Sequence, residues 1–491
     1  MTTNHCPPLS SRHFTIEEVV LDGAIERFVR GGRHLFPRLA DALEGIEEIG
    51  VLGWGSQGRA QALNLRDALA GTDIRVTVGL RAGSASREDA RRCGFIAADG
   101  SLGELSDVAG RADLVLFLVS DAAQVELHGE VFARMKRGAT LGLSHGFLIS
   151  HLANAGEGLP AGVNVVGVCP KGMGLSVRRL FEQGTTKDGA GINVSVAVEQ
   201  DADGRAADVA LAWAIGLGAP FVFTTTMEAE FRSDLFGERG VLLGAVHGLA
   251  ESAYRRLRDQ GVGADEAFAR SAAAITGPIA QTISRSGIEG LVAAILPAEA
   301  ASFECAYAAT YQPCRRVLEE IYDEVVSGRE LAGVIDAGKR LERWPMPPIE
   351  RTSMWRVGAE RRARGLNDGE LDPVTVGAFV ATMIAQIDVL RERGHSWSEI
   401  ANESVIEAVD SLLPYMRARG IAYMVDSCST TARLGARRWG PIFEAAYTRE
   451  AFAAVDDGAA PPAARSLESH PIHGVLTALR DFRPSVDIAV A

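Results

Sequence analysis

The strongest constraint on the fold is a glycine-rich turn between a predicted strand and a predicted helix. The segment IGVLGWGSQGRAQALNLRDAL places Gly53, Gly55 and Gly58 in a G-x-G-x-x-G pattern, directly after an apolar run and directly before a helical one. In a dinucleotide-binding turn these glycines permit the tight bend, the approach of a pyrophosphate and the close packing of the helix. We therefore expect residues 53–58, including Ser56 and Gln57, to bind a dinucleotide. The alternative is a glycine-rich turn in another α/β fold.

The residues after the next predicted strand favour NADPH over NADH. An NAD site presents an Asp or Glu about 20 residues after the glycines, where it binds the ribose 2′-hydroxyl. This chain has VGLRAGSAS there instead, so Arg81, Ser84 and Ser86 offer one cation and two hydroxyls. Such a group suits a 2′-phosphate. The alternative is that Arg81 is a solvated loop residue.

The order of the predicted elements divides the chain into an α/β part and a helical part. From about residue 46 to 226, β-branched runs at 49–52, 76–80, 114–119 and 163–168 alternate with helical stretches. This alternation predicts a parallel sheet covered by helices. The later residues have helical spacing throughout. We predict an N-terminal extension at 1–45, a Rossmann domain at 46–226 and an all-α domain at 227–491.

The helical part contains an internal repeat. Residues 241–288 align without a gap on residues 374–421, at a constant offset of 133, with ten identities among 48 pairs. The matching LRDQG and LRERG units, each ending in glycine, make a duplicated helical unit the favoured interpretation.

Two acidic runs in the helical part have a spacing that suits metal ligands. Glu230, Asp234 and Glu238 follow one another at four-residue intervals, as do Glu403 and Glu407, so each set lies on one helical face. Like charges at this spacing repel, and a solvated acidic face is the alternative to a metal site. At the offset of 133 the counterparts of these pairs are not acidic, which predicts one composite site. Ligands that are all oxygen favour Mg²⁺ or Mn²⁺ over Zn²⁺.

Composition argues against several other classes of protein. The net charge of −13 and the pI near 5.4 disfavour a nucleic-acid or anionic-membrane partner. Six cysteines without a C-x-x-C pair indicate neither a zinc ribbon nor a disulfide framework. We found no basic and apolar leader pattern in residues 1–25 and no long apolar window, so we expect a cytoplasmic protein without a membrane partner.

The motifs taken together resemble one family, the ketol-acid reductoisomerases, over nearly the whole chain. The segments that carry the resemblance are GWGSQGRAQALNLRD, VGLRAGS, GLSHGF, CPKGMGLSVRRLFEQG, SDLFGERGVLLGAVHG, MWRVGAE, NESVIEAVDSL and CSTTARLGARRW. The C-terminal blocks are similar to those of the long, plant-type class. The resemblance implies a Rossmann domain, a knotted helical domain, NADPH, two Mg²⁺ ions per site and a homodimer.

The resemblance also implies a reaction in valine, leucine and isoleucine biosynthesis. A Mg²⁺-dependent alkyl shift would isomerise 2-acetolactate or 2-aceto-2-hydroxybutyrate, and NADPH would then reduce the new 2-keto group to give the 2,3-dihydroxy acid. The implied metal ligands, direct or through water, are Asp234, Glu238, Glu403 and Glu407. Glu230 would support them, and Glu407 would also take part in proton transfer.

Three further residues receive roles from the resemblance. His145 and Lys171 match polar residues that lie between the metals and the nicotinamide, and Ser429 matches a residue that contacts the substrate. Taken without the family, His145 is more simply a structural histidine and Lys171 a surface loop lysine.

Two rival functions remain from other classes. A β-hydroxyacid dehydrogenase related to 6-phosphogluconate dehydrogenase also joins a Rossmann domain to a helical one, but it needs no metal carboxylates. A non-catalytic NADPH-binding protein on a decayed scaffold is the other, and the intact carboxylates, His145, Lys171 and Ser429 argue against it.

Overall fold

The computed structural model describes residues 9–187, 189–349, 352–459 and 467–482, and these fall into two compact units. Unit 1 holds the described residues up to Phe231, together with Leu331–Lys339 and the residues from Arg480 onward. Unit 2 holds Arg232–Glu330 and Arg340–Leu479. The predicted combination of an α/β Rossmann-like part and a helical part is confirmed. The predicted knot stays a prediction.

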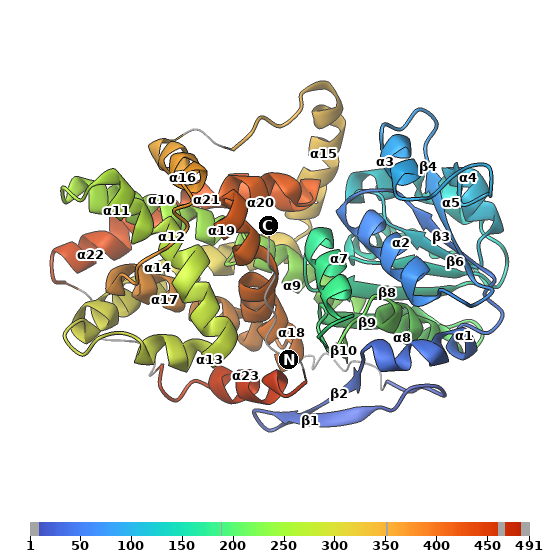
Figure 1. The fold of residues 1–491 in the computed structure, drawn as a ribbon, viewed down its shortest axis with the longest axis horizontal. Coiled ribbons are helices and arrows are strands. Elements are labelled where there is room, and N and C mark those ends of the chain that lie inside the picture. Colours follow the sequence, from blue (N-terminus) through green and yellow to red (C-terminus); the bar gives the residue numbers. More distant parts are fainter. Residues whose placement is uncertain (1–8, 188, 350–351, 460–466, 483–491) are drawn as a thin grey trace. The chain divides into compact units, whose positions relative to one another are not determined.

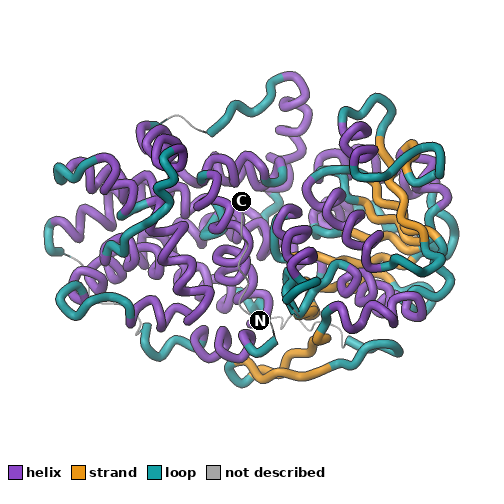
Figure 2. Tube along the Cα trace, in the orientation of Figure 1, coloured by secondary structure: helices purple, strands orange, loops and turns teal. Residues whose placement is uncertain are grey.

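Unit 1 is built on one ten-stranded sheet (Figures 1 and 2). The strands, in order across the sheet, are β1 (Glu17–Leu21), β2 (Ala24–Arg30), β10 (Phe221–Thr224), β9 (Val194–Gln200), β8 (Asn164–Pro170), β7 (Thr140–Leu143), β6 (Leu114–Phe117), β3 (Glu48–Leu52), β4 (Arg75–Leu80) and β5 (Leu102–Glu104). Neighbours from β8 to β5 all pair in parallel. Their carboxyl ends therefore share one edge of the sheet.

Helices cover both faces of this sheet, so its central strands are buried and mostly apolar. The helices are η1 (Arg33–Arg38), α1 (Leu39–Ala42), α2 (Ser56–Ala68), α3 (Ser86–Arg92), α4 (Leu105–Arg111), α5 (Asp121–Arg134), α6 (Phe147–Ala155), α7 (Gly174–Gln183) and α8 (Ala206–Gly216). Along β3, Ile49 and Val51 join the core that includes α2 and α8, whereas Leu52 joins the core that includes α4, α5 and α6. This alternation follows the pleat of a strand with two buried faces.

The pair β1–β2 is an addition that the sequence did not predict. These strands lie within the expected N-terminal extension, yet β2 pairs antiparallel with β10, where Phe28 faces Phe223. Phe28 and Val29 are buried, but charged residues surround them in the chain. The sequence therefore offered no clear strand signal, because only two adjacent positions of β2 are buried and no alternating apolar pattern results.

Unit 2 consists of helices. After α9 (Met227–Arg239), which begins in unit 1, they are α10 (Gly244–Asp259), α11 (Ala264–Ala269), α12 (Ala272–Ala274), η2 (Ile275–Ile279), α13 (Ala280–Ala293), α14 (Ala300–Val326), α16 (Ser353–Ala363), α17 (Pro373–Glu392), α18 (Trp397–Ala401), η3 (Asn402–Ile406), η4 (Ala408–Leu412), α19 (Leu413–Arg419), α20 (Ile421–Ser427), α21 (Thr430–Ala446), η5 (Tyr447–Ala451), α22 (Phe452–Asp456) and α23 (Ile472–Arg480). Helix α15 (Arg329–Arg343) has its ends in unit 2 and its middle, Leu331–Lys339, in unit 1. The segments η2 to η5 are π-helices, whose hydrogen bonds run from i to i+5.

Helix α17 forms the apolar centre of this unit. It is long and apolar enough to cross a membrane by length and composition, but 94% of its most apolar window is buried inside the protein. It packs along α14, and residues such as Phe379 and Ile384 are fully enclosed. Burial of this kind is typical of a core helix.

The two stretches of the sequence repeat contain elements at matching positions. α11 begins at 264 and α18 at 397, η2 begins at 275 and η4 at 408, and α13 begins at 280 and α19 at 413, so each pair differs by 133. Gly261 and Gly394, and likewise Gly287 and Gly420, have positive φ angles at this offset. The stretches differ at 269–273, where Ser271 interrupts the first helix, whereas the second continues as η3.

The cysteines of the described residues are free thiols. They are Cys93, Cys169, Cys305, Cys314 and Cys428, and Cys6 lies outside the described residues.

The buried imidazole of His247 makes the stability of unit 2 depend on pH. It lies on α10, where burial, and then the charges of Arg437 and Arg255, lower the pKa of His247 from 6.5 to about 4. The unfolded chain takes up a proton on this residue near pH 6.5, so stability present above that pH is lost as the pH falls towards 4. From this residue we expect about 2 kcal/mol less unfolding free energy at pH 5 than at pH 7.5. Urea unfolding of wild type and His247→Gln at both pH values measures the effect, and an equal loss in both proteins would contradict it.

Candidate active site

The glycine-rich turn has the conformation that the sequence predicted. Gly53 directly follows β3 with φ of 111°, and a Cβ atom there would lie 2.7 Å from the carbonyl oxygen of Leu118. At Gly58 on α2, a Cβ atom would lie 2.6 Å from the carbonyl oxygen of Gly53. At Gly55 it would meet nothing within 4 Å. The turn therefore packs tightly at its first and third glycines and stays open at its second, where a pyrophosphate needs access.

The neighbouring residues Ser56 and Gln57 hold a second loop in place. Ser56 Oγ accepts a hydrogen bond from the backbone N–H of Gly174 at 3.0 Å, and Gln57 Nε2 donates to the carbonyl oxygen of Gly172 at 2.8 Å. These side chains thus join the glycine-rich turn to the loop that follows β8. Their backbone amides lie in the first turn of α2, the position at which a helix attracts phosphate.

The loop after β4 carries the residues predicted to select the cofactor. Arg81 is exposed, while Ser84 and Ser86 are half-buried, and the loop is closed by hydrogen bonds from Ser84 N to Arg81 O at 3.1 Å and from Ser86 N to Ser84 Oγ at 3.3 Å. Arg87 holds this loop to the sheet, because its Nη2 donates to Leu80 O at 3.0 Å and pairs with Glu104. The guanidinium of Arg81 and the two hydroxyls lie within one short turn.

A buried ion pair lies at the carboxyl ends of β7 and β8. Lys171 Nζ and Glu230 Oε1 are 3.3 Å apart, and both side chains are at most 2% exposed. The other oxygen, Glu230 Oε2, accepts from the backbone N–H of Gly146 at 2.8 Å. Nearby, His145 Nδ1 lies 3.2 Å from Asp121 Oδ1. The structure therefore shows Lys171 deeply buried and charge-paired, and the alternative of a surface loop lysine is wrong.

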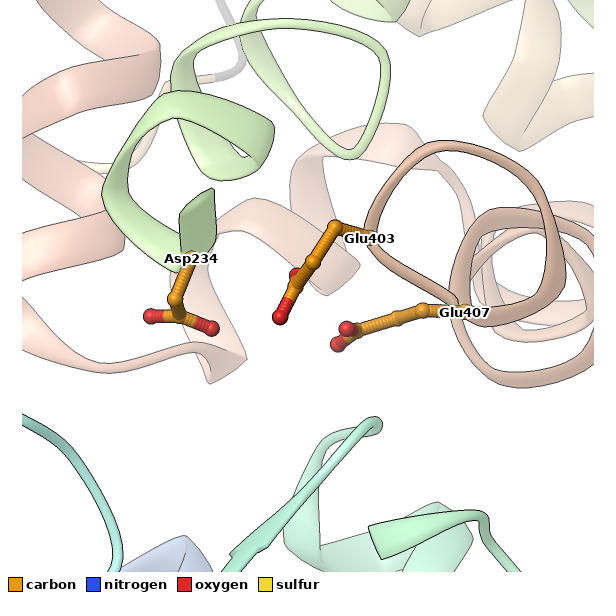
Figure 3. A group of neighbouring side chains, drawn as sticks. All are labelled: Asp234, Glu403 and Glu407. Carbon is orange, nitrogen blue, oxygen red and sulfur yellow. The ribbon is translucent and has the colours of Figure 1, made fainter. Parts of the chain in front are cut away.

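Three of the predicted metal ligands converge within unit 2. Asp234 of α9, Glu403 of η3 and Glu407, which follows η3, each offer an oxygen, and these atoms lie within 4.8 Å of one another. Figure 3 shows the three carboxylates pointing into a common space. Glu403 is fully buried. Carboxylates this close repel one another and favour a compensating cation, and an all-oxygen set suits Mg²⁺, so the residues fit that ion.

The fourth predicted ligand, Glu238, is not among those three. Its Oε2 accepts from Arg239 Nη1 at 2.9 Å, and the buried Arg239 also pairs with Glu330 at 3.0 Å. Burial would raise the pKa of Glu330, but the charge of Arg239 and hydrogen bonds from Trp439 and Arg239 hold it below its usual value. Glu238 is thus held beside the cluster by a fixed cation.

Cys428 and Ser429 lie on the segment between α20 and α21. Burial, followed by the negative charges of Glu238, Glu407 and Asp234, raises the pKa of Cys428 well above its usual value. Ser429 is exposed and caps α21, because its Oγ accepts from Ala432 N at 3.0 Å. Its hydroxyl can still donate to a ligand.

Close backbone contact explains the glycine in the middle of α9. A Cβ atom at Gly237 would lie 3.1 Å from the carbonyl oxygen of Glu403, so α9 and η3 approach closely here. Gln386, which sequence reasoning missed, ties the same segments. It accepts from Val241 N at 2.8 Å and donates to Glu403 O at 3.2 Å. The sequence offered little signal for this contact, because Gln386 is one of several polar residues, such as Thr382 and Asp388, in the buried run of α17.

Family models and known relatives agree over both parts of the chain. The model described as acetohydroxy acid isomeroreductase, NADPH-binding domain, matches residues 43–221, and that described as ketol-acid reductoisomerase, C-terminal domain, matches 227–365 and 372–458. The chloroplastic ketol-acid reductoisomerases of Spinacia oleracea and Pisum sativum are each 50% identical over 97% of this chain, and cover 82% and 84% of those proteins. A solved structure of an NADH-preferring ketol-acid reductoisomerase from an uncultured archean has a TM-score of 0.56 and 26% identity, covering 65% of this chain and 94% of that one.

The expectation of a cytoplasmic protein is wrong in the light of these relatives, because the plant enzymes are chloroplastic. The expectation rested on the pattern of the first 25 residues. A targeting segment is separate from the fold and is removed from the mature protein. The residues that build the fold therefore do not indicate the cellular location.

The ion pair of Lys171 and Glu230 should make a large contribution to stability. Glu230→Gln keeps an oxygen for the N–H of Gly146 but leaves the charge of Lys171 buried without its carboxylate, which we expect to lower the unfolding free energy by about 3 to 5 kcal/mol. The double variant Lys171→Met/Glu230→Gln removes both charges and should recover most of this loss. Urea unfolding at pH 7 measures both, and a double variant no more stable than Glu230→Gln would show that the pairing is not the cause.

Proposed function

The chain belongs to the ketol-acid reductoisomerase family, and from this premise we propose how its residues divide the work of a two-step reaction. Enzymes of this family act in branched-chain amino-acid biosynthesis and use NADPH and Mg²⁺. The rival functions, a β-hydroxyacid dehydrogenase and a non-catalytic NADPH-binding protein, therefore fall away. The proposed reaction is the isomerisation of 2-acetolactate or 2-aceto-2-hydroxybutyrate, followed by reduction to the 2,3-dihydroxy acid.

The observation that carries the proposal is the convergence of Asp234, Glu403 and Glu407. We assign these carboxylates, with Glu238 beside them, to two Mg²⁺ ions. When bound, the ions would supply positive charge to substrate oxygens on which negative charge develops, and NADPH would supply the hydride. Glu407 is the carboxylate assigned to proton transfer as well.

The NADPH assignment follows from the turn and the loop at the edge of the sheet. The open face at Gly55 and the first amides of α2 would receive the pyrophosphate. Arg81, Ser84 and Ser86 would bind the 2′-phosphate, because a guanidinium and two hydroxyls provide charge-assisted hydrogen bonds.

The remaining assigned residues act on the substrate and its surroundings. Glu230 holds Lys171 charged and oriented, and the N–H of Gly146 fixes Glu230 in turn. We propose that Lys171 and His145 stabilise the negative charge that develops on the 2-keto oxygen in the reductive step, and donate a proton to that oxygen. Ser429 would bind the substrate through its hydroxyl.

One chain is proposed to build the complete metal site. The matching element positions at an offset of 133 support a duplicated helical unit, of which each half keeps a different carboxylate pair. The three converging carboxylates all come from the same chain. A homodimer would then add stability but no ligand to this site.

Mixing of inactive subunits tests this arrangement. Asp234→Asn and Glu407→Gln should each abolish Mg²⁺-dependent NADPH oxidation with 2-acetolactate, because each removes a charge from a site for two divalent cations. Reduction of a preformed 2-keto intermediate should suffer less. When the two variant chains are co-expressed, mixed oligomers should recover no activity, since each chain lacks part of its own site.

Two results would overturn different parts of the proposal. Turnover of 2-acetolactate near the wild-type rate in either single variant would remove these carboxylates from the chemistry. Substantial recovery in the mixed oligomers would instead show that the site is shared between chains.

Reversal of charge at Arg81 tests the cofactor assignment. Arg81→Asp sets a negative charge against the 2′-phosphate, and we expect NADPH binding to weaken by about 1 to 3 kcal/mol while NADH binding changes little. The ratio of kcat/KM for the two cofactors is the measurement. Arg134→Asp, the same charge change at an exposed position of α5, is the control. Unchanged discrimination in Arg81→Asp would refute the assignment.

A further inference from the structure

Four buried polar side chains form a continuous chain of hydrogen bonds beside the metal carboxylates. Ser233 Oγ donates to Glu399 Oε1 at 2.8 Å, Glu399 Oε2 lies 3.1 Å from His395 Nδ1, and His395 Nε2 lies 2.8 Å from the hydroxyl of Tyr322. None of the four residues is more than 8% exposed. We call Ser233, Glu399, His395 and Tyr322 the carboxylate brace.

The brace connects the segments that carry the two sets of metal ligands. Ser233 immediately precedes Asp234 on α9, and Glu399 on α18 lies four residues before Glu403. The ring of Tyr322 on α14 packs edge-on against Phe236 of α9, with 5.5 Å between the ring centres. The chain of contacts thus begins on α9 and returns to α9.

Electrostatics explains why Glu399 needs these partners. Glu399, Glu403 and Glu407 follow at four-residue intervals, so three negative charges share one face and repel one another. Mg²⁺ would compensate the last two, whereas Glu399 is bonded to a hydroxyl and an imidazole. A buried carboxylate requires such partners.

The sequence repeat offers an internal comparison. Glu399 aligns with Glu266, and Glu403 aligns with Arg270. Glu266 is largely exposed and pairs with Arg270 at 3.2 Å along its own helix. Glu266, in the first stretch of the repeat, therefore makes a surface ion pair. Its aligned counterpart Glu399, in the stretch that also holds Glu403 and Glu407, makes a buried contact with α9.

We propose that the carboxylate brace positions Asp234 relative to Glu403 and Glu407, so that their oxygens meet the geometry of Mg²⁺. The proposal rests on the proposed function, in which these carboxylates hold the metal. Mg²⁺ demands near-octahedral ligands at about 2.1 Å, so a small shift of α9 against α18 weakens its binding. Glu399 and Ser233 are positioning residues and do not touch the ion.

Ser233→Ala tests the brace with a minimal change. It removes one hydroxyl without altering charge, and we expect Mg²⁺ to bind about tenfold more weakly to the NADPH-loaded enzyme, as is typical when a ligand loses its support. Titration calorimetry with MgCl₂ gives the affinity. The Mg²⁺ concentration for half-maximal activity should rise in parallel, whereas kcat at saturating Mg²⁺ and the Kd for NADPH should stay near wild type.

Two further variants separate positioning from a general loss of structure. Ser252→Ala removes an equally buried hydroxyl, which donates to the backbone of Glu444, and should leave Mg²⁺ affinity unchanged. In a Glu399→Met background, Ser233→Ala should add no further loss, because the hydrogen bond is already absent. Glu399→Gln retains an acceptor for Ser233 and should bind Mg²⁺ more tightly than Glu399→Met.

The outcomes distinguish this proposal from the function on which it rests. If Asp234→Asn loses Mg²⁺ binding but Ser233→Ala binds like wild type, the brace has no positioning role. Additive losses in the double variant, or an equal loss in Ser252→Ala, would also overturn it. If Asp234→Asn itself binds Mg²⁺ like wild type, the metal site lies elsewhere and the proposed function fails first.

Discussion

The arrangement of unit 2 around its candidate metal site depends on the repulsion between carboxylates that lie close together. Asp234 and Glu407 converge on the fully buried Glu403, and such a group of like charges is unfavourable without compensation. Each neighbouring carboxylate has a partner of its own, with Arg239 beside Glu238 and the imidazole of His395 beside Glu399. Arg239 and His395 thus lie against the two flanking carboxylates, whereas the three converging carboxylates are the ones that we assign to Mg²⁺.

In unit 1, the polar residues of the candidate site follow strands that are themselves buried and mostly apolar. β3, β4, β7 and β8 run in parallel, so the residues after them emerge at one edge. The glycine-rich turn, the Arg81 loop, His145 and Lys171 all occupy that edge. Side-chain bonds from Ser56 and Gln57 to the loop after β8 fix the turn and the Lys171 loop to each other, so one part of the edge cannot move alone.

The sequence predicted the features that depend on residues close together in the chain, and missed those that depend on distant residues. The turn could be predicted because Gly53 and Gly58 satisfy steric demands within a few residues of the chain, and the four-residue spacing of Glu403 and Glu407 is equally local. The π-helical segments could not, because their residues differ little from those of an α-helix and only the hydrogen bonds distinguish them. Glu399 looked like any helix-surface glutamate, since its partner Ser233 is 166 residues away.

The enclosure of α17 has a consequence for how the protein reaches its folded state. Its most apolar window matches a membrane span in length and composition alone, yet 94% of that window is buried inside the protein. The neighbours that cover α17, such as α10, α14 and η3, are distributed over more than a hundred residues of sequence, so the cover forms only when distant segments have come together. Until then the apolar surface of α17 is exposed to solvent, and transiently exposed apolar surface of this kind promotes aggregation.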